Sequence, residues 1–191
     1  MAHRALNLAI IIGSTREGRF GDTVGRWIAA EAAGHGSFSI DLIDLAEIEL
    51  PTTHRAKPTP QVGAFRARLA AADAFVVVTP EYNHSYPASL KHAIDQGYVE
   101  WMAKPVAFVS YGGTTGGVRA IEHLRHVLAE LHAATIRDYV CFLMARRQFD
   151  PDGRPVDPEG PHKAAKTMLD RLAWWAEALR NAREARPYVK S

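Results

Sequence analysis

The chain has 191 residues, of which 47% are hydrophobic, and this suits one domain of ordinary size with a single large core. Its 23 Lys and Arg residues against 21 Asp and Glu give a formal net charge of +2, and their scatter provides no basic stripe for a nucleic acid partner. No apolar stretch approaches the ~20 residues of a membrane span and the N-terminus lacks a signal-peptide pattern, so we expect a cytoplasmic protein with no membrane partner.

The first elements read as strand, helix and strand. The apolar run Leu6–Ile12 predicts a strand buried on both faces. Helical spacing of apolar residues then begins at about Gly21, with Asp22 as a plausible N-cap, and stops at Gly34–Gly36. The alternating segment Phe38–Ile43 predicts a second strand, which we expect at an edge of the sheet.

The middle of the chain continues this alternation. Residues 46–60 contain three prolines and no period, which predicts an extended surface loop that serves as a lid or an interface. A helical stripe over Val62–Ala72 leads into Ala74–Thr79, a β-branched run typical of a central strand. A helix over about Ala88–Gln96 then precedes a fourth strand, Pro105–Tyr111.

The last third predicts two helices around a fifth strand. Val118–Leu131 has the spacing of an amphipathic helix, and Ala134–Met144 follows as a strand with a possible break at Asp138. Phe149–Gly160 is rich in Asp, Gly and Pro and predicts a loop, and His162–Arg186 predicts a long closing helix.

Five alternations of strand and helix predict an α/β fold with a parallel, doubly wound sheet and right-handed crossovers. We expect a flavodoxin-like three-layer sandwich with five parallel strands in the order 2-1-3-4-5. The whole chain, 1–191, forms one domain in this interpretation, with its core at about 6–180. This order places a switch point for ligand binding between the first and third strands.

The loop after the first strand has the composition of an anion site. Ser14, Thr15, Arg16 and Arg19 offer hydroxyl and guanidinium groups, and the helix that begins near Gly21 directs backbone N–H groups to the same place. The Gly-x-Gly-x-x-Gly and Gly-x-x-x-x-Gly-Lys-Ser/Thr patterns are absent from this loop, which argues against a dinucleotide fold and a nucleoside triphosphatase. The alternative is a plain turn with surface arginines.

The loops after the third and fourth strands suit a flat ligand. In the second loop Pro80 predicts an abrupt turn, while Tyr82 and Asn83 supply a ring and an amide. The third loop, Gly112–Gly117, is rich in glycine, which permits positive φ and close approach of the backbone to a ring edge. A simple turn and a flexible linker are the alternatives, but the position of both loops at one sheet edge favours a groove for a flat, phosphate-bearing molecule.

These three loops resemble the signatures of the NADPH-dependent FMN reductases, flavodoxin-fold enzymes that include quinone, azo-dye and chromate reductases. The matching residues are Gly13-Ser14-Thr15-Arg16 with Phe20-Gly21, Pro80-Glu81-Tyr82-Asn83, and Ser110-Tyr111-Gly112-Gly113 with Gly116-Gly117. The resemblance extends from about Leu6 to Leu179.

The resemblance implies FMN as cofactor and assigns its contacts. The FMN phosphate would be surrounded by Ser14, Arg16, Arg19, Phe20 and Gly21. The isoalloxazine would be held by Pro80, Glu81, Tyr82, Asn83, Ser110, Gly112 and Gly113. Arg19 and Gly21 depart from the family pattern, which has a small hydroxyl residue and Asn at these positions.

The activity implied is transfer of a hydride from NADPH or NADH to FMN N5, followed by reduction of a small acceptor such as a quinone, free flavin, azo compound or metal oxyanion. Because the cofactor supplies the chemistry, we assign no catalytic side chain and no metal. The alternatives are a flavodoxin-type electron-transfer module without reductase activity, which the net charge of +2 disfavours, and a protein that binds FMN without turnover. The resemblance also implies a homodimer or homotetramer.

Several other residues attract attention without a role in this interpretation. Cys141 is expected to be a buried strand residue, and His84 either touches the flavin or is an exposed loop residue. At least one of Trp174 and Trp175 is expected to pack in the core or an interface. Three histidines on one predicted helix lack metal-site spacing, namely His123, His126 and His132.

Overall fold

The computed structural model describes residues 4–53 and 57–188. Its strands are β1 (Leu6–Ile12), β2 (Phe38–Asp44), β3 (Ala74–Pro80), β4 (Pro105–Tyr111) and β5 (Ala134–Phe142). Its α-helices are α1 (Gly21–His35), α2 (Pro60–Ala71), α3 (Ala88–Ile94), α4 (Val118–Glu130) and α5 (Glu159–Ala185). Two short 3₁₀ helices, η1 (Leu45–Glu47) and η2 (Ala145–Arg147), follow β2 and β5.

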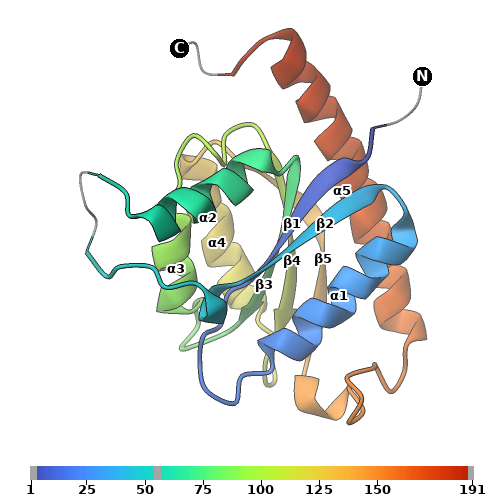
Figure 1. Cartoon of the computed structure of the whole chain (residues 1–191). Helices are drawn as coiled ribbons and strands as arrows, with labels where there is room; N and C mark the ends of the chain where they lie inside the picture. Colours follow the sequence, from blue (N-terminus) through green and yellow to red (C-terminus); the bar gives the residue numbers. More distant parts are fainter. Residues whose placement is uncertain (1–3, 54–56, 189–191) are drawn as a thin grey trace.

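All five strands form one parallel sheet in the order β2-β1-β3-β4-β5, which confirms the flavodoxin-like prediction (Figure 1). The strand β3 lies at the centre, where all its residues are buried, and β2 lies at an edge as expected. Because the strands are parallel, every loop that leaves a strand at its carboxyl end emerges on the same side of the molecule.

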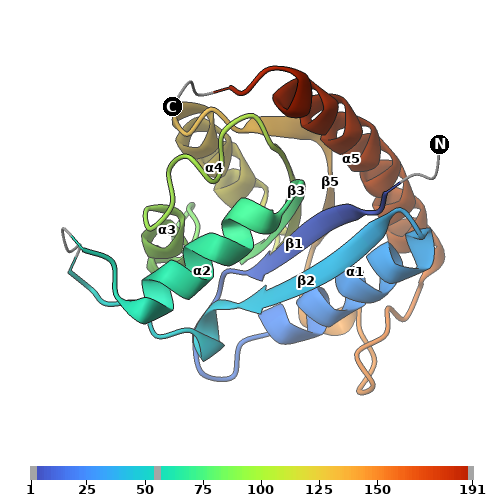
Figure 2. The same cartoon turned by 45° about the horizontal axis from the view of Figure 1, so that its top comes forward.

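The helices cover both faces of the sheet, giving three layers. α1 and α5 lie on one face, and α2, α3 and α4 lie on the other (Figure 2). Alternate residues of β1 enter opposite cores, since strand side chains point to the two faces in turn: Ile10 packs with the α1–α5 side and Ile11 with the α2–α4 side. This double burial explains the continuous apolar run seen in the sequence.

The fifth strand is shorter than predicted. It ends at Phe142 and not at Met144, because Met144 takes a left-handed conformation with φ 47° and begins η2. The pairing of β5 with β4 is irregular between Val106 and Phe108, and this bulge accommodates the break expected at Asp138. The early end of β5 places the following residues beside the cavity described below.

One expectation about helix residues was wrong, and a second was wrong only for the core. Phe20 is the N-cap of α1, and Asp22 lies inside the first helical turn, so Asp22 is not the cap. Trp174 and Trp175 are 64% and 41% exposed, so neither packs in the core of the chain, and packing of either one in an interface stays a prediction.

The loop predicted over 46–60 is confirmed in part. Leu45–Glu47 forms η1 and α2 begins at Pro60, while residues 54–56 lie outside the described residues. Across the described ranges 4–53 and 57–188, no helix combines the length and the apolar character needed to cross a membrane.

Candidate functional site

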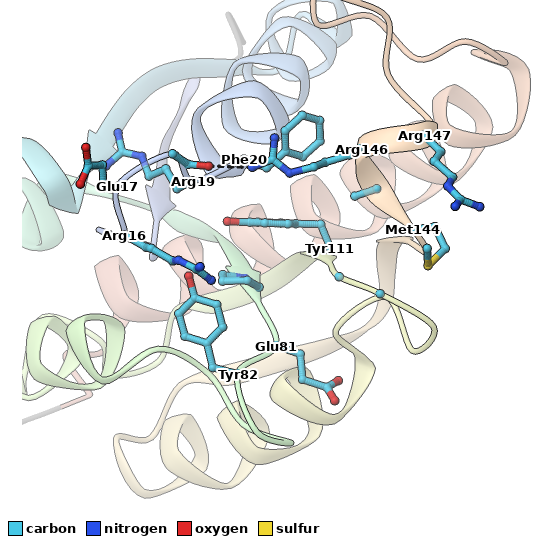
Figure 3. A pocket seen from close by; sticks show the side chains of 15 residues that line it. Arg16, Glu17, Arg19, Phe20, Glu81, Tyr82, Tyr111, Met144, Arg146 and Arg147 are labelled. Carbon is cyan, nitrogen blue, oxygen red and sulfur yellow. Dashed lines mark hydrogen bonds between the residues drawn. The ribbon is translucent and has the colours of Figure 1, made fainter.

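A cavity of about 450 Å³ lies at the carboxyl edge of the sheet, where the three loops meet (Figure 3). Its walls come from the first loop, the second loop, the end of β4 with the third loop, and the segment after β5. The lining residues are Arg16, Glu17, Gly18, Arg19, Phe20, Pro80, Glu81, Tyr82, Tyr111, Gly112, Gly113, Met144, Ala145, Arg146 and Arg147. The predicted convergence of separate loops on one groove is therefore present.

The two arginines of the first loop differ in their surroundings. Arg19 is mostly buried and its Nη2 donates to Asp44 Oδ2 at 2.5 Å, which fastens the loop to the end of β2. The Arg16 guanidinium is exposed and points toward the cavity (Figure 3), and it has no hydrogen-bond or ion-pair partner within the described parts of the chain. Arg16 is thus the guanidinium of this loop that is available to a ligand.

Two residues predicted to surround a phosphate, Ser14 and Gly21, are not among the residues that line the cavity. Ser14 is fully buried, and its hydroxyl lies 2.9 Å from the Tyr82 hydroxyl, so it joins the first loop to the second. Gly21 leaves space that the Tyr111 side chain uses: a Cβ at position 21 would lie 2.7 Å from the Tyr111 hydroxyl oxygen. Glycine at this position is therefore explained by packing.

The second loop reverses direction later than predicted. β3 continues through Pro80, and the chain turns at Asn83 and His84, whose φ values are 50° and 69°. The backbones of Tyr82 and Ser85 exchange hydrogen bonds of 2.7 and 3.0 Å across this turn. Two successive left-handed residues are typical of a type I′ turn, so the reversal depends on Asn83 and His84 and not on Pro80. Neither of these two residues lines the cavity.

Glu81 joins the second loop to the third. Its side chain is 8% exposed, and its carboxylate accepts hydrogen bonds from the Thr115 hydroxyl at 3.0 Å, the Arg119 backbone N–H at 3.3 Å and Arg119 Nη1 at 3.0 Å. Burial alone would raise the pKa of the Glu81 carboxyl, but the hydrogen bonds from Arg119 and Thr115 outweigh it and hold the pKa below its ordinary 4.5. Glu81 is therefore ionised. We call its hydrogen bonds from Thr115 and Arg119, which join the second loop to the third, the Glu81 clasp.

This clasp gives a pH dependence that can be measured. Because the folded-state pKa of Glu81 is lowered, its stabilising contribution is present above about pH 4.5 and is lost as the pH falls through the folded value. We expect the difference in free energy of unfolding between the wild type and Glu81→Gln to be constant near neutral pH and to shrink in acid. Urea titrations at several pH values measure it, and a difference that stays constant into acid contradicts the clasp.

The third loop is fixed by backbone hydrogen bonds to the segment after β5. The N–H of Met144 donates to Gly113 O at 2.8 Å, and the N–H of Ala145 donates to Gly112 O at 3.1 Å. The positive φ values expected of this loop occur at Gly116 and Gly117, at 62° and 91°. Gly112 and Gly113 instead line the cavity, and the close approach of their backbone to a ligand ring stays a prediction.

Ser110 and Cys141 lie beneath the third loop. Ser110 is fully buried, and its hydroxyl oxygen lacks a hydrogen-bond partner among the residues that the structure describes. Cys141 is half-buried, its thiol donates to Gly116 O at 3.4 Å, and burial raises its pKa. Cys141 is thus held as a neutral thiol in β5, in keeping with a strand residue.

Several residues that line the cavity are not among those predicted from the sequence. Tyr111 lies in the third signature and ends β4 but has no predicted ligand contact; it is 6% exposed, and burial raises the pKa of its hydroxyl so that it remains a neutral O–H donor. The others come from the first loop and from the segment read as the end of the fifth strand, namely Glu17, Gly18, Met144, Ala145, Arg146 and Arg147. The predicted strand order could have identified the residues after β5, because the carboxyl end of β5 lies at the same edge of the sheet as the three loops.

Comparison with known proteins identifies the family. The model of the family described as NADPH-dependent FMN reductase matches residues 6–146, which is most of the chain. The chain belongs to the NADPH-dependent FMN reductase family.

Two relatives match this chain over most of their own length. The chain is 31% identical to a 2-hydroxy-1,4-benzoquinone reductase of Burkholderia sp over 184 residues, covering 92% of this chain and 99% of the relative. It is 35% identical to a probable NADPH:quinone oxidoreductase 2 of Oryza sativa subsp. japonica over 183 residues, covering 90% and 89%. The structure of FerB, a flavoenzyme NAD(P)H:(acceptor) oxidoreductase from Paracoccus denitrificans, matches with TM-score 0.71 at 23% identity and covers 91% of this chain and 98% of FerB.

The cofactor of the FMN reductase family fits the groups present at this site. The first turn of α1 has no side-chain cap in the described chain, so its N–H groups at the end of the first loop are open to an anion. The exposed Arg16 guanidinium is a suitable second partner for a phosphate. Tyr82, Tyr111 and Phe20 line the cavity with aromatic surface, which suits a flat ring system.

Proposed function

We propose that this protein is an FMN-dependent NAD(P)H oxidoreductase that reduces a small acceptor of the quinone class. The observation that carries the proposal is the cavity itself: an unpaired guanidinium and an uncapped helix N-terminus at one side, with aromatic walls and glycine backbone at the other. The similarity to the 2-hydroxy-1,4-benzoquinone reductase of Burkholderia sp and to the probable NADPH:quinone oxidoreductase 2 of Oryza sativa subsp. japonica supports the choice of acceptor.

The protein residues have binding and orienting roles in this proposal. Arg16 and the N–H groups at the start of α1 hold the phosphate, while Pro80, Tyr82 and the backbone of Gly112 and Gly113 hold the ring. Bound FMN supplies the redox chemistry, since it accepts a hydride and returns two electrons to an acceptor. The Glu81 clasp and the bonds between η2 and the third loop keep these walls in place.

Rapid mixing under anaerobic conditions tests the proposal. We expect NADPH or NADH to bleach the visible absorbance of the FMN-loaded protein, and a simple benzoquinone to restore it. If neither NADPH nor NADH bleaches the flavin, the proposed reductase function is wrong. Tight FMN binding with reduction only by a one-electron donor would instead support an electron-transfer module. Reduction of azo compounds, free flavin or metal oxyanions, the cytoplasmic location and a homodimeric or homotetrameric state stay predictions.

A further inference from the structure

The ion pair of Arg19 bears on which residues meet the FMN phosphate. The side chains of Arg19 and Asp44 are only 17% and 12% exposed, and Asp44 also accepts a hydrogen bond from the Ala46 N–H at 3.0 Å. A phosphate bound to Arg19 would have to share the guanidinium with this carboxylate, which repels a second anion. Arg19 is therefore poorly suited to phosphate binding, although its position in the first loop predicts that role.

Arg146 reaches the same loop from η2, the short helix after β5. Its Nη2 donates to Gly18 O at 2.7 Å across a sequence separation of 128 residues. Its guanidinium carbon lies 5.2 Å from the centre of the Phe20 ring, at cation–π distance. Figure 3 shows Arg146 extending along Phe20 toward the first loop, above the Tyr111 ring. These two contacts fix the guanidinium at the wall of the cavity.

The Arg146 charge is not cancelled by a carboxylate. No ion pair joins Arg146 to any residue in the described ranges. The Gly18 carbonyl accepts from Nη2 only, so other N–H groups of the guanidinium can still donate to a ligand. The backbone that carries it is also fixed, because the N–H groups of Met144 and Ala145 are bonded to the third loop. A preorganised guanidinium with free donors is the kind of group that binds phosphate oxygens well.

We propose that Arg146, acting with Arg16, binds the FMN phosphate, and that Arg19 serves to hold the first loop to β2. The inference rests on the proposed FMN function and changes its residue assignment. It makes the segment after β5 part of the phosphate site, beside the loop that follows β1.

A comparison of FMN with riboflavin tests this assignment, because riboflavin lacks the phosphate. With bound flavin removed, fluorescence titration should show that Arg146→Gln weakens FMN binding by about tenfold, the scale of a lost hydrogen bond to a charged group. Riboflavin affinity should stay at the wild-type value. Arg146→Lys should recover part of the FMN affinity, because lysine keeps the positive charge but lacks the planar, paired N–H donors of the guanidinium. Arg171→Gln, which removes the same charge from the exposed surface of α5, is the matched control.

Three outcomes overturn the assignment. Equal losses of FMN and riboflavin affinity in Arg146→Gln would make Arg146 only a brace for the first loop. A loss restricted to FMN in Arg147→Gln but absent from Arg146→Gln would move the contact to the neighbouring residue. A larger FMN-specific loss in Arg19→Gln than in Arg146→Gln would restore Arg19 to the phosphate. All three are read from flavin binding alone, so they are separate from a failure of nicotinamide to reduce the flavin.

Discussion

Arg16→Ala is expected to weaken FMN binding by roughly 1.5 to 3 kcal/mol, a factor between about 10 and 150. The Arg16 side chain lines the cavity, is exposed, and has no partner in the described residues. Its removal therefore takes away a charge-assisted contact and leaves no buried group unpaired. The binding loss should occur without loss of fold stability.

The dissociation constant of FMN, measured by fluorescence titration beside a thermal melt of the flavin-free protein, checks this expectation. Arg16→Lys should lie between the wild type and Arg16→Ala, because lysine keeps the charge but cannot grip two phosphate oxygens in a fixed plane. If the dissociation constant of Arg16→Ala equals that of the wild type, the phosphate does not meet the first loop. An equal fall in riboflavin affinity would assign Arg16 to the ring or ribityl chain instead.

Gly117→Ala is expected to lower the free energy of unfolding by roughly 2 to 5 kcal/mol and to abolish tight FMN binding. Gly117 has φ 91°, a conformation that strains any residue with a Cβ. A Cβ there would also lie 2.8 Å from the Ser110 Cβ and 3.2 Å from the Tyr111 backbone nitrogen, and neither atom is the free end of a flexible side chain. The third loop must therefore move to accept even a methyl group.

Gly113→Ala is the matched control for stability. It removes a glycine from the same loop, but a Cβ at position 113 would meet no atom within 4 Å, and its φ is not in the left-handed region. Urea unfolding should place Gly113→Ala close to the wild type and Gly117→Ala well below it. Equal stabilities for the two variants would mean that the third loop is loose and does not form a rigid wall.

The sequence was sufficient for the fold because the sheet is buried on both faces. Continuous apolar runs such as Leu6–Ile12 and Ala74–Thr79 are what a parallel strand between two helical layers requires. The alternation with amphipathic helices then fixed parallel pairing, and parallel pairing brought the polar loops to one edge. Local patterns also predicted that the first loop binds an anion and that the third loop approaches a ligand with its backbone.

Tertiary structure decided which of those polar residues are free to act. The residue types of the first loop alone do not show that Arg19 is occupied and Arg16 is free, because the partner of Arg19 is Asp44, 25 residues away at the end of a neighbouring strand. The approach of Arg146 to Gly18 likewise depends on the early end of β5 and on a separation of 128 residues. Residue type and order thus determined where the site forms. Which charged side chains stay unpaired at the site depends on contacts between strands and loops that are distant in sequence, and these contacts exist only in the folded sheet.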